Sequence, residues 1–198
     1  MSVNTPSVNE NGHARRLVVG MTGASGAIYG VRALITLKAL AVETYLVITP
    51  PGITTLHQEL DLALEDVQAL ATHTYDSQDF TAPIASGSFA TCGMLVAPCS
   101  IKTLSAIAHS HADNLLNRAA DVTLKEGRPL LVVVRETPLH LGHLRLMVQA
   151  AEIGAIIFPP VPALYAHPTT LDEMVEHTVG RMLARLSIAN ALYAPWGT

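Results

Sequence analysis

Short apolar runs alternate along this chain with longer stretches in which hydrophobic residues recur at helical spacing. The apolar runs predict five buried strands, at residues 16–22, 44–49, 94–97 (closed by Pro98), 129–135 and 155–158. The stretches between them predict helices at residues 27–41, 53–60, 64–71, 102–109, 113–126, 141–153 and 171–189. Continuous apolar strands joined by helices are typical of a parallel sheet that is buried on both faces. The pattern therefore predicts one doubly wound α/β domain over residues 15–198, after a polar, disordered leader at residues 1–14.

The composition adds an expectation about assembly and location. Hydrophobic residues make up 49% of the chain and charged residues only 14%, so we expect a homo-oligomer that buries apolar surface between subunits. The net charge of −4 and the lack of a basic stripe argue against a nucleic-acid partner. No apolar run reaches the roughly 20 residues that span a membrane, and no signal core precedes the first strand. With two cysteines and no disulfide framework, the sequence predicts a cytoplasmic protein.

The first predicted strand leads into Thr22-Gly-Ala-Ser-Gly26 and then a helix, at the edge of the sheet where α/β proteins bind ligands. Glycines let a ligand approach the backbone, and a helix start offers N–H groups to an anion. The spacing is not G-x-G-x-x-G, and the second strand ends at Thr49 without an acidic residue for a ribose. These features disfavour NAD and favour a mononucleotide, although a plain strand-to-helix turn fits this segment equally well.

A second hydroxyl-rich helix start follows the third strand. Ser100 and Thr103 flank it, where hydroxyl groups either cap the helix or bind phosphate. Two such starts after neighbouring strands favour an anion site more than either does alone. The loop at residues 85–89 is rich in small residues, which is typical of a flexible turn or of close approach by a ligand.

Cationic side chains are scarce here, with 12 Lys and Arg in total, yet four of them suit a phosphate. Arg118 and Lys125 are seven residues apart on a predicted helix and therefore point to one side. Arg135 follows the fourth strand at the binding edge, and Arg181 lies in the last helix. A lone cation is usually a solvated surface charge, but a cluster of these four would bind a phosphate dianion.

Several common motifs are missing. The chain has no Walker loop, no Asp-rich helix for magnesium and no G-x-S-x-G elbow. His140 and His143 have metal-ligand spacing, but no further ligand pattern accompanies them, so we interpret them as surface or core histidines. Chemistry on a phosphate-bearing substrate would thus be metal-free.

Five segments together closely resemble the UbiX-type flavin prenyltransferases, over nearly the whole chain from Arg15 to about Trp196. They are Met21-Thr-Gly-Ala-Ser-Gly-Ala-Ile-Tyr-Gly30, Ala85-Ser-Gly-Ser-Phe89, Pro98-Cys-Ser-Ile-Lys-Thr-Leu-Ser105, Arg118-Ala-Ala-Asp-Val-Thr-Leu-Lys-Glu126 and Val134-Arg-Glu-Thr-Pro-Leu-His-Leu141. The resemblance implies flavodoxin-like subunits in a dodecamer, with each site at a subunit junction. It also implies binding of reduced FMN and dimethylallyl phosphate, whose prenyl group is joined to flavin N5 and C6. The prenylated FMN would pass to a UbiD-type decarboxylase.

The resemblance further implies roles for individual residues. The FMN contacts would be Gly23, Ala24, Ser25, Thr49, Ser100, Ile101, Lys102, Thr103 and Arg135. The prenyl-phosphate contacts would be Ser86 or Ser88, Arg118, Lys125, Tyr165 and Arg181, and the catalytic groups Glu59, Ser86, Lys125 and Glu136. Cations would stabilise the leaving phosphate, and Glu136 or the released phosphate would take the proton from C6. The chain departs from the family at Pro50-Pro51, after the second strand, and at Gly127, where many members carry Arg.

Two alternatives remain open at this point. An FMN-dependent decarboxylase of cysteine-containing substrates shares the fold and the flavin site. Its Pro-x-Met-Asn-x-x-Met-Trp segment is missing from this sequence, however, and such enzymes lack the phosphate-binding set of Arg118, Lys125 and Arg181. A non-catalytic FMN carrier, or an accessory subunit of a decarboxylase, would need the flavin site and not the phosphate-binding cations.

Overall fold

The computed structural model describes residues 15–195, so the predicted leader at residues 1–14 lies outside the described residues. Six parallel strands form one sheet in the order β3-β2-β1-β4-β5-β6. The strands are β1 (Arg16–Met21), β2 (Glu43–Ile48), β3 (His73–Tyr75), β4 (Met94–Cys99), β5 (Leu130–Val134) and β6 (Ala155–Ile157). The predicted doubly wound α/β fold is confirmed.

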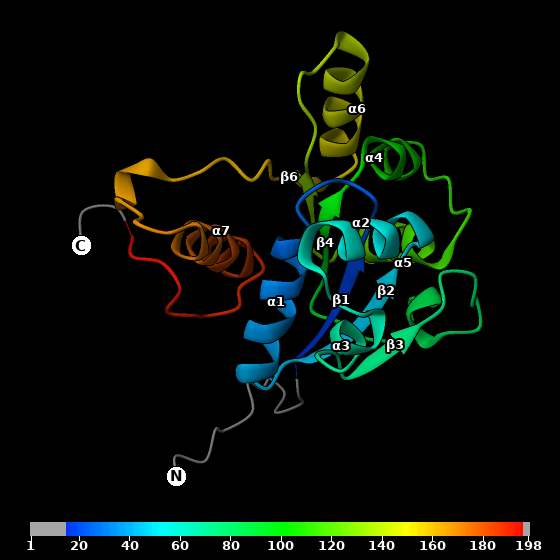
Figure 1. The fold of residues 1–198 in the computed structure, drawn as a ribbon. Coiled ribbons are helices and arrows are strands. Elements are labelled where there is room, and N and C mark those ends of the chain that lie inside the picture. The colour runs from blue at the N-terminus through cyan, green and yellow to red at the C-terminus, as the bar shows by residue number, and fades with distance from the viewer. Residues whose placement is uncertain (1–14, 196–198) are drawn as a thin grey trace.

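Helices cover both faces of this sheet (Figure 1). They are α1 (Ala27–Ala39), α2 (Pro50–Leu60), α3 (Leu64–Gln68), α4 (Ile101–Ala108), α5 (Leu115–Lys125), α6 (Leu141–Glu152) and α7 (Leu171–Arg185), with short 3-10 turns η1 (Pro83–Ala85) and η2 (Leu164–Ala166). Buried residues of α1, α2, α3 and α7 share one core, and those of α4, α5, α6 and η1 share the other. Helices α5 and α7 therefore lie on opposite faces of the sheet.

Successive strand residues supply these two cores in turn. Leu17 and Val19 of β1 belong to the core of α1 and α7, whereas Val18 between them belongs to the core of α5. Because both faces are dry, the strand is apolar at every position instead of every second one. This is the physical reason why its sequence reads as a continuous hydrophobic run.

The structure corrects the predicted elements at β3 and β4 and at two helix ends, since α2 begins at Pro50 and not at residue 53, and α7 ends at Arg185 and not at residue 189. Strand β3 was not predicted, because it is a three-residue edge strand whose His73 and Thr74 are exposed. Strand β4 does not stop before Pro98 but continues to Cys99, with a register shift against β5 between Val96 and Cys99. Proline is tolerated there because only its carbonyl is used, accepting a hydrogen bond from the N–H of Thr22 at 3.2 Å.

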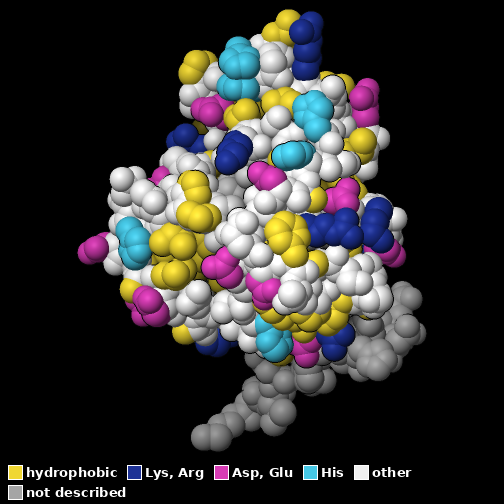
Figure 2. Space-filling model, turned by 90° about the vertical axis from the view of Figure 1, so that its right-hand side faces the viewer, with side chains coloured by type: hydrophobic (Ala, Val, Ile, Leu, Met, Phe, Trp, Pro, Cys, Tyr) yellow, Lys and Arg dark blue, Asp and Glu magenta, His cyan; other side chains and the backbone are white. Residues whose placement is uncertain are grey.

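Helix α6 projects from the rest of the molecule (Figure 1). Leu141, Leu144 and Val148 on this helix are 59%, 46% and 56% exposed, and Ala150 is its one buried residue. In Figure 2 this projection is the top of the molecule, where hydrophobic and histidine side chains gather. An apolar stripe thus remains uncovered by the described part of the chain. Among residues 15–195, no helix combines the length and the hydrophobicity needed to cross a membrane.

Candidate active site

A cavity of about 440 Å³ opens where the carboxyl ends of β1, β2 and β4 meet the helix starts that follow them. Its size is within the range of small-molecule sites. The lining residues are Gly23, Thr49, Pro50, Pro51, Ser77, Gln78, Ser100, Lys102, Thr103, Asp113, Asn114 and Asn117. Five of the residues predicted to contact a flavin therefore share one cavity, although they come from three separate segments of the chain.

The start of α1 differs from the prediction. We expected its N–H groups to be free for an anion, but the Glu59 carboxylate of α2 accepts hydrogen bonds from the N–H groups of Gly26 at 2.8 Å and Ala27 at 2.9 Å. Partial burial acts to raise the pKa of Glu59, but hydrogen bonds from Ser25, Ala27 and Gly26 and the charge of Arg135 outweigh it. The pKa of Glu59 therefore lies below its ordinary value, and the carboxylate is an ionised cap of α1.

The start of α2 offers no N–H group in its first two positions, because both are proline. Thr49 caps this helix, its hydroxyl oxygen accepting a hydrogen bond from the N–H of Gly52 at 3.3 Å. Pro51 also lies against the turn after β1, since a Cβ added to Gly23 would be 2.5 Å from the Pro51 Cβ. The proline pair thus shapes the cavity wall without binding an anion through its backbone.

The start of α4 is the helix start of this cavity that best suits an anion. The Ser100 hydroxyl accepts a hydrogen bond from the Thr103 N–H at 3.3 Å, and the Ser100 N–H donates to the Thr22 hydroxyl at 2.8 Å. The N–H groups of Ile101 and Lys102, in the first helical turn, have no partner within the helix. Together with the positive end of the helix and the Lys102 side chain, they suit a phosphate group.

Arg135 and Glu136 follow β5 at the same edge of the sheet. The Arg135 side chain lies beside the turn before α1, with its Cγ 3.9 Å from the Cβ that Gly26 would carry, and its charge contributes to the low pKa of Glu59. Glu136 is exposed, and its carboxylate accepts a hydrogen bond from the Thr137 N–H at 3.0 Å. Arg135 therefore lies with the residues predicted to contact the flavin, and Glu136 follows it, exposed, at the same edge of the sheet.

The buried surface of the cavity also has an unpaired acceptor. Asn117 is 5% exposed, and its side-chain oxygen has no hydrogen-bond partner within residues 15–195. Its side-chain nitrogen donates to Asp113 at 2.6 Å. The cavity thus offers N–H groups for a phosphate at α4, hydroxyl groups along its wall and the unpaired Asn117 oxygen. These groups fit a mononucleotide such as FMN, which has a phosphate at one end and hydroxyl groups in the middle.

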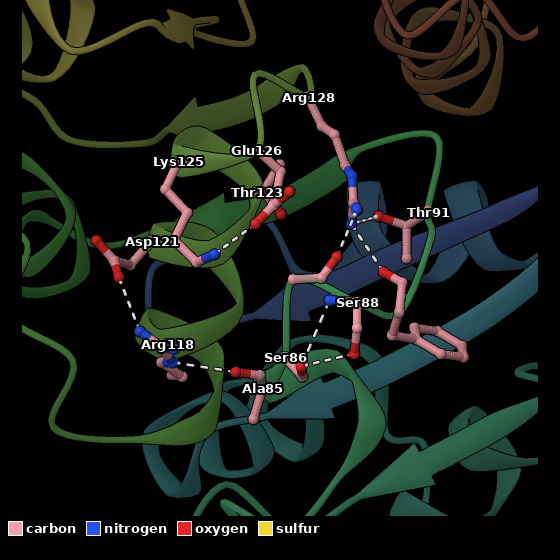
Figure 3. Close-up of polar contacts among 12 residues, drawn as sticks. Ala85, Ser86, Ser88, Thr91, Arg118, Asp121, Thr123, Lys125, Glu126 and Arg128 are labelled. Atoms are coloured by element: carbon pink, nitrogen blue, oxygen red, sulfur yellow. Dashed lines mark hydrogen bonds and ion pairs between the residues drawn. The ribbon is translucent and has the colours of Figure 1, made fainter.

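A second group of predicted residues surrounds the loop before β4 (Figure 3). The Ser86 and Ser88 hydroxyl groups are 2.9 Å apart. Arg118 donates from Nε to the Ala85 carbonyl at 3.1 Å, and Lys125 forms an ion pair with Glu126 next to Gly87. Arg118 and Lys125 thus lie on one side of α5, as predicted, and both reach this serine loop (residues 85–89).

Sequence reasoning missed two further charged residues at the serine loop. Arg128 donates to the carbonyls of Gly87 and Phe89, both at 2.8 Å, and so fixes the second half of the loop. The Glu126 carboxylate, whose pKa is lowered by Lys125 and Arg128, orients the Lys125 ammonium. The dense charge run at the end of α5 was the signal that could have identified them.

A third group lies on α7. Tyr165, from η2, makes an edge-to-face contact with His177, and Arg181 follows one turn later on the same helix. Because α5 and α7 cover opposite faces of the sheet, one chain does not bring Arg118 and Lys125 together with Arg181 (Figure 1). The serine loop also enters the amino end of β4, whereas the flavin residues follow carboxyl ends.

Of the two histidines at residues 140 and 143, His140 caps a helix. The His140 ring nitrogen Nδ1 accepts hydrogen bonds from the N–H groups of Gly142 and His143, at 3.0 and 3.4 Å, at the start of α6. Within the described residues no three His, Cys, Asp or Glu side chains come together as metal ligands.

Comparison with known proteins identifies the family. Residues 5–182 match the Flavoprotein family. The chain is 57% identical, over 185 residues, to the flavin prenyltransferase UbiX of Escherichia coli strain K12, covering 92% of this chain and 98% of that protein. The chain therefore belongs to the Flavoprotein family and, within it, to the UbiX flavin prenyltransferases, which confirms the resemblance.

Two solved structures agree with this assignment. One is AnUbiX (PadA1), crystallised in complex with FMN and dimethylallyl pyrophosphate, with a TM-score of 0.91, 44% identity and coverage of 93% of this chain and 98% of that one. The other is a dodecameric, FMN-dependent UbiX-like decarboxylase from Escherichia coli O157:H7, with a TM-score of 0.90, 44% identity and coverage of 92% and 100%.

Proposed function

We propose that this chain is an enzyme that joins the dimethylallyl group of dimethylallyl phosphate to N5 and C6 of reduced FMN, without a metal ion. Its membership of the UbiX flavin prenyltransferases supports the reaction class. The observation that carries the proposal is the serine loop beside Arg118 and Lys125, because a flavin carrier or a cysteine decarboxylase has no need of a second phosphate site.

We assign the FMN half of the site to the carboxyl edge of the sheet. The first turn of α4 would hold the flavin phosphate through the N–H groups of Ile101 and Lys102, with the hydroxyl groups of Ser100 and Thr103 beside them. Glu59 holds the turn at Gly23, Ala24 and Ser25 in place for the flavin ring, and Arg135 lies over that turn. When bound, reduced FMN supplies the nucleophilic atoms.

We assign the leaving phosphate to cations and hydroxyl groups of two surfaces. Ser86, Ser88, Arg118 and Lys125 form one phosphate surface, and Tyr165 and Arg181 form the other. Preorganised cations stabilise the negative charge that develops on the phosphate as the allylic C–O bond breaks. The bond to C6 forms at the expense of the remaining prenyl C=C bond, whose other carbon takes up the proton that N5 loses, and Glu136, at the end of β5, is our proposed acceptor for the proton released from C6. Holding both substrates in one orientation supplies much of the remaining acceleration.

We propose that neighbouring subunits complete each site. The two phosphate surfaces lie on opposite faces of one chain, and the apolar stripe of α6 is exposed, so both features support assembly into a homo-oligomer. A related structure is a dodecamer, and we propose the same assembly here. We further propose that the protein works in the cytoplasm and passes prenylated FMN to a UbiD-type decarboxylase.

The test is mass spectrometry of the flavin extracted after anaerobic incubation of the full-length protein with reduced FMN and dimethylallyl phosphate. We expect the flavin mass to increase by one prenyl group, in the presence of a metal chelator as well as in its absence. A flavin that binds but keeps its mass would contradict the proposed function and support a carrier or a decarboxylase.

A further inference from the structure

A buried histidine on α7 has no part in the proposed chemistry. His177 is 7% exposed, and neither of its ring nitrogens has a hydrogen-bond partner within residues 15–195. Leaving a buried polar atom unpaired costs free energy, so a purely apolar side chain would fill this position at lower cost. The two nitrogens therefore contribute nothing to the packing, and what His177 offers its neighbours is a flat aromatic ring.

The ring of His177 makes its contacts with two tyrosine rings. It meets Tyr165 of η2 at a centroid distance of 5.6 Å and an interplanar angle of 82°, and Tyr193 at 5.8 Å and 75°. Both are edge-to-face arrangements, which are favourable for aromatic pairs. Arg181 lies four residues further along α7, and side chains at this spacing are neighbours on a helix surface.

The segment after α7 is firmly held at this place. Asn190 donates from its side chain to the Gly180 carbonyl at 3.0 Å. A Cβ on Gly180 would be 2.9 Å from the Asn190 side-chain oxygen and 3.0 Å from the Tyr193 ring, so only glycine allows this approach. The Tyr193 ring therefore has a fixed position against the His177 ring.

The segment on the other side of the ring, η2, is more exposed. None of the three residues of η2 is buried, Leu164 is 69% exposed and Tyr165 is 41% exposed. The contact between Tyr165 and His177 thus ties a largely exposed segment to α7. Burial lowers the pKa of His177, and the charge of Arg181 lowers it further, so the ring is neutral near pH 7 and packs as an aromatic group.

We propose that His177 is a positioning residue, an aromatic wedge that holds Tyr165 and Arg181 at the fixed separation needed to bind the phosphate of the prenyl donor. This inference rests on the proposed function, which assigns these two residues to the phosphate. His177 acts through the shape of its ring and not through its nitrogens, since those have no partner.

Two substitutions separate ring shape from ring chemistry in the full-length protein. His177→Leu removes the wedge, and we expect it to raise the KM for dimethylallyl phosphate by about tenfold and to lower kcat by a smaller factor, because Arg181 is displaced but not deleted, with FMN affinity little changed. His177→Phe keeps a flat ring without the unpaired nitrogens. We expect the KM of the wild type and a melting temperature a few degrees higher.

A matched control is Val179→Ala, on the same helix but in the core shared with α1, where Val179 is fully buried. It should lower the melting temperature and leave the KM unchanged. A KM increase in Val179→Ala equal to that of His177→Leu would overturn the inference, as would an unchanged KM in His177→Leu or a raised KM in His177→Phe. Arg181→Ala distinguishes the two proposals: if it raises the KM and His177→Leu does not, only this inference fails.

Discussion

The flavin cavity and the phosphate-binding surfaces show how differently one chain prepares two halves of a site. At the cavity, capping residues from the same chain already fix the turn before α1 and the starts of α2 and α4. The phosphate-binding residues, in contrast, are divided between the serine loop and α7, on opposite faces of the sheet. A single subunit thus preorganises the cavity that we propose for FMN, whereas on our proposal the cations for the second substrate are completed by a neighbouring subunit.

The largest effect that tests this comparison comes from mixing two inactive variants. We expect Lys125→Ala and Arg181→Ala each to lower turnover by about a hundredfold, the loss typical of a removed charge-stabilising group. If Lys125 and Arg181 of one site come from different subunits, random co-assembly of the two variants leaves about a quarter of the sites intact in a symmetric oligomer. Turnover of differently tagged, co-expressed variants measures this recovery.

A control for mixing uses two residues of the same surface. Arg118 and Lys125 lie against one serine loop within a single chain. Mixing Arg118→Ala with Lys125→Ala should therefore restore no activity. Equal recovery in both mixtures, or none in either, would contradict the division between subunits.

A smaller effect on turnover is expected from Gly87→Ala, which tests the role of the serine loop by itself. The added methyl group would press on the Glu126 carboxylate and lie 2.7 Å from the Lys125 nitrogen, so both flexible ends must move. Displacing a charge-stabilising group without deleting it should reduce turnover by about tenfold. FMN affinity, measured by fluorescence quenching, should not change, because the flavin cavity is elsewhere.

Gly127→Ala is the matched control for this prediction. Gly127 has a φ of +65°, and a Cβ there would meet nothing within 4 Å. The alanine should cost about 1 kcal/mol of stability through backbone strain alone and leave turnover unchanged. If Gly127→Ala slows turnover as much as Gly87→Ala does, the effect is due to lost stability.

The smallest effect concerns the flavin half and its dependence on pH. Because the folded-state pKa of Glu59 is lowered, its carboxylate stabilises the fold above the ordinary pKa of about 4.3, and this contribution is lost as pH falls through the lowered pKa. We expect Glu59→Gln to melt a few degrees below the wild type at pH 7. The gap should close as the pH falls toward 3.

Glu152→Gln, at the exposed end of α6, is the reference for these melting curves. Its melting temperature should follow that of the wild type at every pH. A gap between Glu59→Gln and the wild type that is constant with pH would mean that the capping interaction does not depend on charge.

The sequence was a good guide to the fold because the hydrophobic effect acts on long runs of residues. Strands such as β5, with five buried apolar residues in a row, were visible at once. Strand β3 was not, because pairing at a sheet edge relies on backbone hydrogen bonds that leave His73 and Thr74 free to be polar. Likewise, Pro98 was predicted to end the third strand. The strand continues past it because the N–H of Thr22 needs only the Pro98 carbonyl as its hydrogen-bond acceptor.

The candidate site could be predicted only in part, since it depends on contacts between distant segments. Residues next to strand ends, such as Gly23 and Ser100, follow from topology, and the cavity brings them together. That Glu59 caps α1 could not be seen, because it lies 33 residues from Gly26 in the chain. Nor does spacing reveal that α5 and α7 face away from each other, because this depends on the order of strands in the sheet.

The uncovered leucines and valine of α6 have a consequence for how this protein must be handled and made. A newly folded subunit exposes these apolar side chains until it binds its partners, so correct assembly competes with aggregation. Because association obeys mass action, dilution should release subunits that bind flavin but, on the proposed division of the site, lack one of the two phosphate surfaces. Catalytic capacity per milligram would then depend on how much protein is present, a property that a self-sufficient monomer does not have.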